Sequence, residues 1–100
     1  MDVFDGRISE ILAEVVSICQ SIPEINEIIL FGSRAKGTHM PKSDIDIALK
    51  GSGIDIESVR DDVNEIDTLL KIDLIDLDTC KNALLIKEVE KDGISLYRKI

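Results

Sequence analysis

Hydrophobic residues recur at helical spacing, every three or four positions, in three parts of the chain. The first helix ends before Pro23, which cannot continue it. The second spans 55–69 with Asp55 as its N-cap, and the third spans 80–92 with Gly93 placed as a C-terminal cap. The apolar positions of the first two helices are Phe4, Ile8, Ile11, Leu12, Val15, Cys19 and Ile22, then Ile56, Val59, Val63, Ile66 and Leu70.

Shorter apolar or alternating segments predict four strands, at 25–31, 44–50, 71–77 and 94–98. The second strand alternates strictly: Ile45, Ile47 and Leu49 share one face, and Asp44, Asp46 and Ala48 share the other. Residues 34–43, with Gly37 and Pro41, are expected to form a loop. The order α-β-β-α-β-α-β predicts an α/β (α+β) fold, a small mixed β-sheet with flanking helices, as a single domain over residues 1–100.

Composition narrows the classes of function. The chain has 100 residues, 44% of them hydrophobic, and a formal net charge of −8, which argues against general binding to nucleic acid. The start "MDVFDGRISE" has no secretory signal, and no apolar run approaches the length of a membrane span, so we expect a cytoplasmic protein without membrane association. Cys19 and Cys80 have no metal-binding spacing and are expected to be reduced thiols.

Connections between the strands predict that three carboxylates meet. The dozen residues between the first two strands favour an antiparallel pair, which brings Gly32-Ser33 close to Asp44. The β-α-β unit that follows favours a parallel pair. If those two strands are neighbours, Asp44, Asp46 and Asp73 lie near the same end of the sheet. Alternation along the third strand does not choose between Asp73 and Asp76.

Such a cluster of carboxylates is unfavourable by itself, so either the pKa values of its members rise or a cation binds. Two unit charges about 4 Å apart repel by roughly 4 kcal/mol at an effective dielectric near 20. Carboxylate oxygens spaced i,i+2 on a strand suit a pair of Mg²⁺ ions bound together with substrate phosphates. A Gly-Ser turn offers backbone N–H groups and a hydroxyl to those phosphates. The pattern predicts in-line phosphoryl or nucleotidyl transfer.

The segments "FGSRAKG", "SDIDIAL" and "KIDLIDL", with ten residues between Ser33 and Asp44, resemble the minimal nucleotidyltransferases of the DNA polymerase beta superfamily. The resemblance extends to the closing "KDGISLYRK" and implies the nucleotidyltransferase fold. It implies that Asp44 and Asp46 bind both metals, and that Asp73, in preference to Asp76, binds the catalytic metal and orients the acceptor hydroxyl. Gly32 and Ser33 would hold the triphosphate, with Arg34 and Lys36 as further cations near its phosphates.

The resemblance also implies a function. Minimal members pair with small helical proteins of the HEPN type, as antitoxins that add AMP to a hydroxyl of the toxin. The implied activity is Mg²⁺-dependent transfer of NMP from an NTP to a hydroxyl of such a partner. ATP, which would give AMP, or another NTP would be the donor. A HEPN-type partner or a second copy of the chain would supply the surface that selects the acceptor, and an exposed apolar helix face is expected there. The alternatives are a non-catalytic binding subunit and transfer to a small molecule or an RNA end.

Overall fold

The computed structural model describes residues 6–99, and Phe4 therefore lies outside the described residues. The elements in chain order are α1 (Gly6–Gln20), β1 (Ile25–Phe31), α2 (Ser33–Lys36), β2 (Ile45–Gly51), α3 (Ile56–Val63), β3 (Ile72–Asp76), α4 (Ala83–Asp92) and β4 (Ile94–Arg98). The predicted fold class is confirmed, and the predicted order holds with one addition, the short helix α2.

The strands form one mixed sheet in the order β3-β2-β1-β4. β1 is antiparallel to β2, and β2 is parallel to β3, as the connection lengths predicted. β4 pairs antiparallel with the other edge of β1. Phe31, the last residue of β1, lies opposite Asp46. In turn, Asp46 lies opposite Asp73 on β3. The end of β1 and the starts of β2 and β3 therefore meet at one edge of the sheet.

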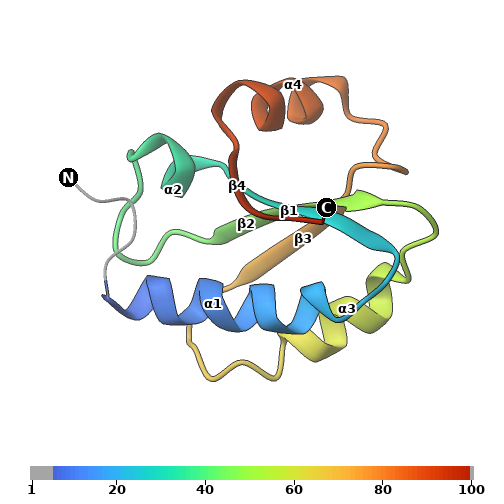
Figure 1. The fold of residues 1–100 in the computed structure, drawn as a ribbon. Coiled ribbons are helices and arrows are strands. Elements are labelled where there is room, and N and C mark those ends of the chain that lie inside the picture. The colour runs from blue at the N-terminus through green and yellow to red at the C-terminus, as the bar shows by residue number, and fades with distance from the viewer. Residues whose placement is uncertain (1–5, 100) are drawn as a thin grey trace.

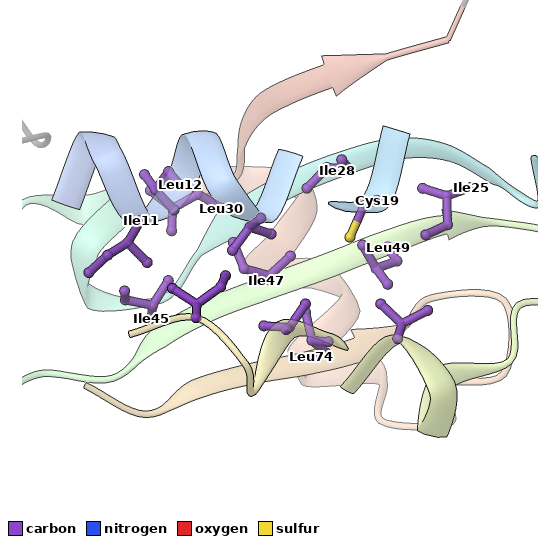
Figure 2. Close-up of a cluster of buried hydrophobic side chains, with 14 of the residues drawn as sticks. Ile11, Leu12, Cys19, Ile25, Ile28, Leu30, Ile45, Ile47, Leu49 and Leu74 are labelled. Atoms are coloured by element: carbon purple, nitrogen blue, oxygen red, sulfur yellow. The ribbon is translucent and has the colours of Figure 1, made fainter. Parts of the chain in front are cut away.

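Helices cover both faces of the sheet, with α1 and α3 on one side and α4 on the other (Figure 1). On the α1 side, Ile45, Ile47 and Leu49 of β2 pack with Leu30 of β1 and with the apolar stripe of α1 (Figure 2). Each fully buried Leu or Ile side chain contributes roughly 1.5–3 kcal/mol, so this larger cluster supplies most of the hydrophobic stabilisation.

A smaller cluster lies on the opposite face. There Ile29, Phe31 and Ala48 pack under Val89 of α4. Strand alternation puts Asp46 on the same face as Ala48, and Asp73 on the same face as Ile75, which belongs to this cluster. The two aspartates therefore face the α4 side, at the edge where the smaller cluster ends.

The segment 34–43, predicted to be entirely loop, begins inside helix α2, so that prediction was wrong at its start. Gly32 has a φ of 76° and turns the chain sharply after β1. The backbone N–H groups of Ala35 and Lys36 donate to the Gly32 carbonyl, and Gly37 ends the helix in the left-handed conformation. A helix of one turn is too short to give a hydrophobic period, which is why the sequence pattern missed it.

The second predicted helix is shorter than expected, because α3 ends at Val63 with Asn64 as its C-cap. Ile66 is nevertheless buried and Leu70 packs against the core, so a turn continues the apolar pattern beyond the helix. Asp55 caps α3 as predicted, accepting a hydrogen bond from the Ser58 N–H.

The remaining differences are small. The helix predicted over 80–92 begins at Ala83, where the Asn82 side chain accepts from the Leu85 N–H. Gly93 occupies the C-cap of that helix, as expected, but with extended rather than left-handed backbone. A Cβ there would lie 2.3 Å from the Val89 carbonyl oxygen, so glycine is needed for space. Within residues 6–99, no helix is long and apolar enough to cross a membrane.

Candidate active site

Two of the predicted carboxylates lie side by side. Asp46 on β2 and Asp73 on β3 are register partners on parallel strands. Asp44 is exposed and lies one residue before β2, and its charge acts on Asp46. Asp76 lies at the other end of β3, opposite Leu49, where its carboxylate accepts a hydrogen bond from the Asp78 N–H. The register therefore brings Asp73, and not Asp76, to the Asp46 end of the sheet.

The surroundings of Asp46 disfavour its negative charge. Partial burial and, after it, the negative charges of Asp73, Asp44 and Glu88 together raise the pKa of the Asp46 carboxyl from an ordinary 3.8 to about 6. The ammonium of Lys71 acts in the opposite direction and lowers this pKa. The ionised form of Asp46 would therefore be stabilised by a bound cation.

Gly32 lies directly against Asp46. A Cβ built at Gly32 would be 2.3 Å from Oδ2 of Asp46, closer than any stable contact. Gly32 also has φ 76° and ψ −160°, a conformation in which side chains are strained. The glycine of the Gly-Ser pair is therefore required twice, for its backbone angles and for the space beside the carboxylate. Ser33, the first residue of α2, is half-buried next to it.

The two cations of α2 point in different directions. Lys36 reaches α4, where its Nζ lies 3.0 Å from Oε1 of Glu88, and this hydrogen bond raises the pKa of Lys36. Arg34 is buried, and its guanidinium donates to the carbonyls of Pro41 and Ser43. Lys36 therefore lies on the side of the sheet that carries Asp46, while Arg34 is occupied by the loop that leads to Asp44.

The donor set fits a hard divalent cation in its chemistry, because carboxylate oxygens are the ligands that Mg²⁺ prefers. The half-exposed Asp73 is paired with Lys71, its Oδ1 lying 3.4 Å from the Lys71 Nζ. In the part of the chain that the structure describes, no three acidic, histidine or cysteine side chains converge on a common point as a metal would require. A metal bound by Asp73 would therefore compete with the Lys71 ammonium for its carboxylate.

Glu88 and Lys71 were missed by the sequence reasoning. Helix α4 packs on the sheet through Leu85 and Val89. Glu88 lies three positions after Leu85 and directly before Val89, so helical spacing places it toward the same face of the sheet as Asp46. The sequence already contained this spacing. Lys71 directly precedes β3, but nothing in the sequence distinguishes it from a solvated charge.

Comparison with protein families gives a match between residues 13–99 and the model described as polymerase beta, nucleotidyltransferase. The chain belongs to this family. The polymerase beta nucleotidyltransferase match covers β1, β2 and β3, and with them Gly32, Ser33 and the three aspartates. A comparison with curated proteins returns no significant match, so the relationship rests on the family match and on solved structures.

Several solved structures share the nucleotidyltransferase fold of this chain. One is a toxin–antitoxin complex with AMP-PNP, with 26% identity and a TM-score of 0.72, covering 88% of this chain and 73% of the other. Another is a tri-AMPylated HEPN toxin from Shewanella oneidensis in complex with its MNT antitoxin, with 23% identity and a TM-score of 0.68, covering 91% and 72% of the two chains. A third, the MntA–HepT toxin–antitoxin complex, has 23% identity, a TM-score of 0.67 and coverage of 91% and 73%.

Proposed function

We propose that this protein transfers NMP, specifically AMP from ATP, to a hydroxyl of a partner protein of the HEPN type, and that it thereby acts as an antitoxin. The observation that carries the proposal is the pairing of Asp46 with Asp73 beside Gly32-Ser33, with the Asp46 pKa raised to about 6. A clustered, disfavoured set of charges offers nothing to a surface that only binds a partner.

The proposed reaction is an in-line displacement at the α-phosphorus of the nucleotide. The oxygen of the acceptor hydroxyl bonds to this phosphorus as the bond to the pyrophosphate oxygen breaks. Asp73 orients the hydroxyl and accepts its proton, while the Gly32 backbone and the Ser33 hydroxyl hold the triphosphate. Asp44, Asp46 and Asp73 would hold two Mg²⁺ ions, which, when bound, offset the carboxylate and phosphate charges and polarise the reacting oxygens.

Support for the nucleotide and for the partner comes from the relatives. The toxin–antitoxin complex with AMP-PNP suggests an adenine nucleotide as the substrate. The complex that contains a tri-AMPylated HEPN toxin suggests a toxin hydroxyl as the acceptor. The formal charge of −8 disfavours an RNA end as the acceptor, because few cations are available to hold its phosphates.

A second candidate is a binding subunit that neutralises its partner without catalysis. The observation that favours it is the ion pair between Asp73 and Lys71, which occupies the third carboxylate. Both residues are partly or largely exposed, and an exposed pair of this kind contributes at most about 1 kcal/mol. A divalent cation can therefore displace Lys71 from Asp73 at little cost in free energy. For this reason we favour the catalytic proposal.

The test is a transfer assay with the protein, labelled NTPs, Mg²⁺ and the product of the neighbouring gene. Wild type is compared with Asp46→Asn, and Asp61→Asn, an exposed position on α3, serves as the charge-matched control. We expect label on the partner with wild type and the control only. Transfer that survives Asp46→Asn would refute the assignment of the carboxylates. Partner binding without transfer from any NTP would establish the binding subunit instead.

A further inference from the structure

Arg34 is the largest of the fully buried side chains, with 1% of its surface exposed. Its Nε and Nη2 donate to the Ser43 carbonyl oxygen at 3.1 and 3.0 Å, and Nη2 also donates to the Pro41 carbonyl oxygen at 3.2 Å. A buried guanidinium is costly unless its donors are satisfied. The loop carbonyls satisfy two of its nitrogens, so Arg34 and the loop from Pro41 to Ser43 are structurally dependent on each other.

Arg34 points away from the carboxylates. Residues two positions apart in a helix lie about 200° apart around its axis, so the side chains of Arg34 and Lys36 leave α2 on opposite sides. Lys36 reaches Glu88 of α4, on the Asp46 side of the sheet. Arg34 instead lines a cavity together with Ile8 of α1 and with Leu70. A triphosphate beside Asp46 would therefore lie on the side of α2 opposite to the guanidinium.

Ser43, which Arg34 holds, directly precedes Asp44. The same serine is fixed within the loop, since its N–H donates to the Met40 carbonyl and its Oγ accepts from the Met40 N–H. Beyond Asp44, the Ile45 N–H donates to the Lys71 carbonyl at the start of the parallel pairing. The backbone of Asp44 is thus held between Arg34 on one side and β3 on the other.

We propose that Arg34 is a positioning residue, one that fixes the backbone of Asp44 relative to the Gly32-Ser33 turn rather than contacting phosphate. This inference rests on the proposed function for its chemistry and departs from the phosphate-binding role that the sequence implied for Arg34. Since Arg34 follows Ser33 directly, a single side chain connects the triphosphate turn to the first metal ligand. A lysine at this position keeps the charge but cannot donate to two carbonyls with the same fixed geometry.

The test compares wild type with Arg34→Lys in the transfer assay and in the unliganded protein. If Arg34 orients the ligand Asp44, Arg34→Lys is expected to lower kcat about tenfold or more. The substitution should also raise the Mg²⁺ concentration that gives the half-maximal rate. The KM for ATP should change by less than about twofold, because no nucleotide contact is removed. A raised KM with unchanged kcat would assign Arg34 to phosphate and overturn the inference.

The unliganded protein gives a readout that does not depend on transfer. In Arg34→Lys the Ser43 and Ile45 amide hydrogens should exchange with solvent faster than in wild type, and Mn²⁺ should bind more weakly. If wild type transfers no nucleotide, the proposed function fails, and these two measurements alone decide the positioning role. Unchanged exchange at both amides would overturn that role.

Two further variants guard against a general loss of stability. Arg98→Lys alters an arginine that pairs with Glu27, remote from Asp44, and should leave all these readouts unchanged. Ser43→Ala removes the acceptor for the Met40 N–H and loosens the same loop without disturbing the buried guanidinium. It should lower kcat in the same direction, so the inference remains testable even if Arg34→Lys does not fold.

Discussion

Asp46 and Asp73 face each other across two parallel strands, and the charge of Asp73 helps to raise the pKa of Asp46. Both residues lie on the face of the sheet that carries the smaller apolar cluster, where burial also disfavours the charge of Asp46. Their proximity therefore costs stability in the unliganded protein. Such a cost is typical of sites that are arranged for a ligand.

The first prediction concerns pH. Because the folded pKa of Asp46 is raised to about 6 from 3.8, the folded state binds the proton more tightly than the unfolded state. The free energy of unfolding should therefore fall as pH rises from about 4 to about 6, and stay lower above that window. Solvent screening at this half-exposed group reduces the expected loss to about 1 kcal/mol.

Urea denaturation of Asp46→Asn across this pH range checks the prediction. The variant should be more stable than wild type at pH 7.5, and the difference should shrink toward pH 4, where the wild-type carboxyl is neutral. Asp61→Asn, on the exposed face of α3, is the control. Equal stability of Asp46→Asn and wild type at pH 7.5 would contradict the idea that this carboxylate is disfavoured.

The second prediction concerns divalent cations. Mg²⁺ or Mn²⁺ should raise the thermal midpoint of wild type, since a ligand at ten times its Kd adds about 1.4 kcal/mol to stability. Asp46→Asn and Asp73→Asn should abolish this shift. Asp76→Asn should unfold at a lower temperature but keep the shift, because Asp76 is buried at the other end of β3. Loss of the shift in Asp76→Asn alone would assign the metal to that carboxylate.

The third prediction concerns Gly32. Gly32→Ala should cost about 1–2 kcal/mol for its positive φ and should also disturb Asp46, whose Oδ2 lies 2.3 Å from the added carbon. Gly53→Ala is a matched control, with a φ of 69° but nothing within 4 Å of the added carbon. Both variants should lose stability, but only Gly32→Ala should lose the response to Mg²⁺. A normal response in Gly32→Ala would separate this turn from the carboxylate site.

The fourth prediction concerns the ion pair between Lys36 and Glu88. Lys36→Met should raise the KM for ATP roughly tenfold, the loss expected for one charge-assisted contact to phosphate. Glu88→Gln should change the KM in the opposite direction, because it frees Lys36 and removes a negative charge that acts on Asp46. Initial-rate measurements at saturating Mg²⁺ check both. An unchanged KM in Lys36→Met would place Lys36 outside the nucleotide site.

An exposed apolar face on one helix was expected at a partner interface, but the exposed apolar side chains of the described residues are dispersed. Within residues 6–99, the exposed large hydrophobic side chains are Met40, Leu69 and Leu84, in three separate segments. Only Leu84 is on a helix, α4. A cavity beside α1, lined in part by Leu12, Val16 and Leu96, is a further apolar feature, and it lies on the side of the sheet opposite to Asp46.

The sequence by itself determined the strands, the pairing of β2 with its neighbours and the shared face of Asp46 and Ala48. These follow from alternation and from connection length, which act over a few residues or through general rules of topology. The same local rules could not find α2, because one helical turn has no period. They extended α3 too far, because a turn carried Leu70 to the core at helical spacing.

Only the tertiary structure showed which of Asp73 and Asp76 lies beside Asp46, and that Arg34 and Lys36 have different surroundings. The first depends on which residue of β3 lies opposite Asp46, a register that packing of the whole sheet fixes. The second depends on what lies beyond α2 on each side, the loop carbonyls for Arg34 and Glu88 for Lys36. Alternation and charge can be read from neighbouring residues of the sequence. The residues that contact one another across strands and helices are defined only once the chain is folded.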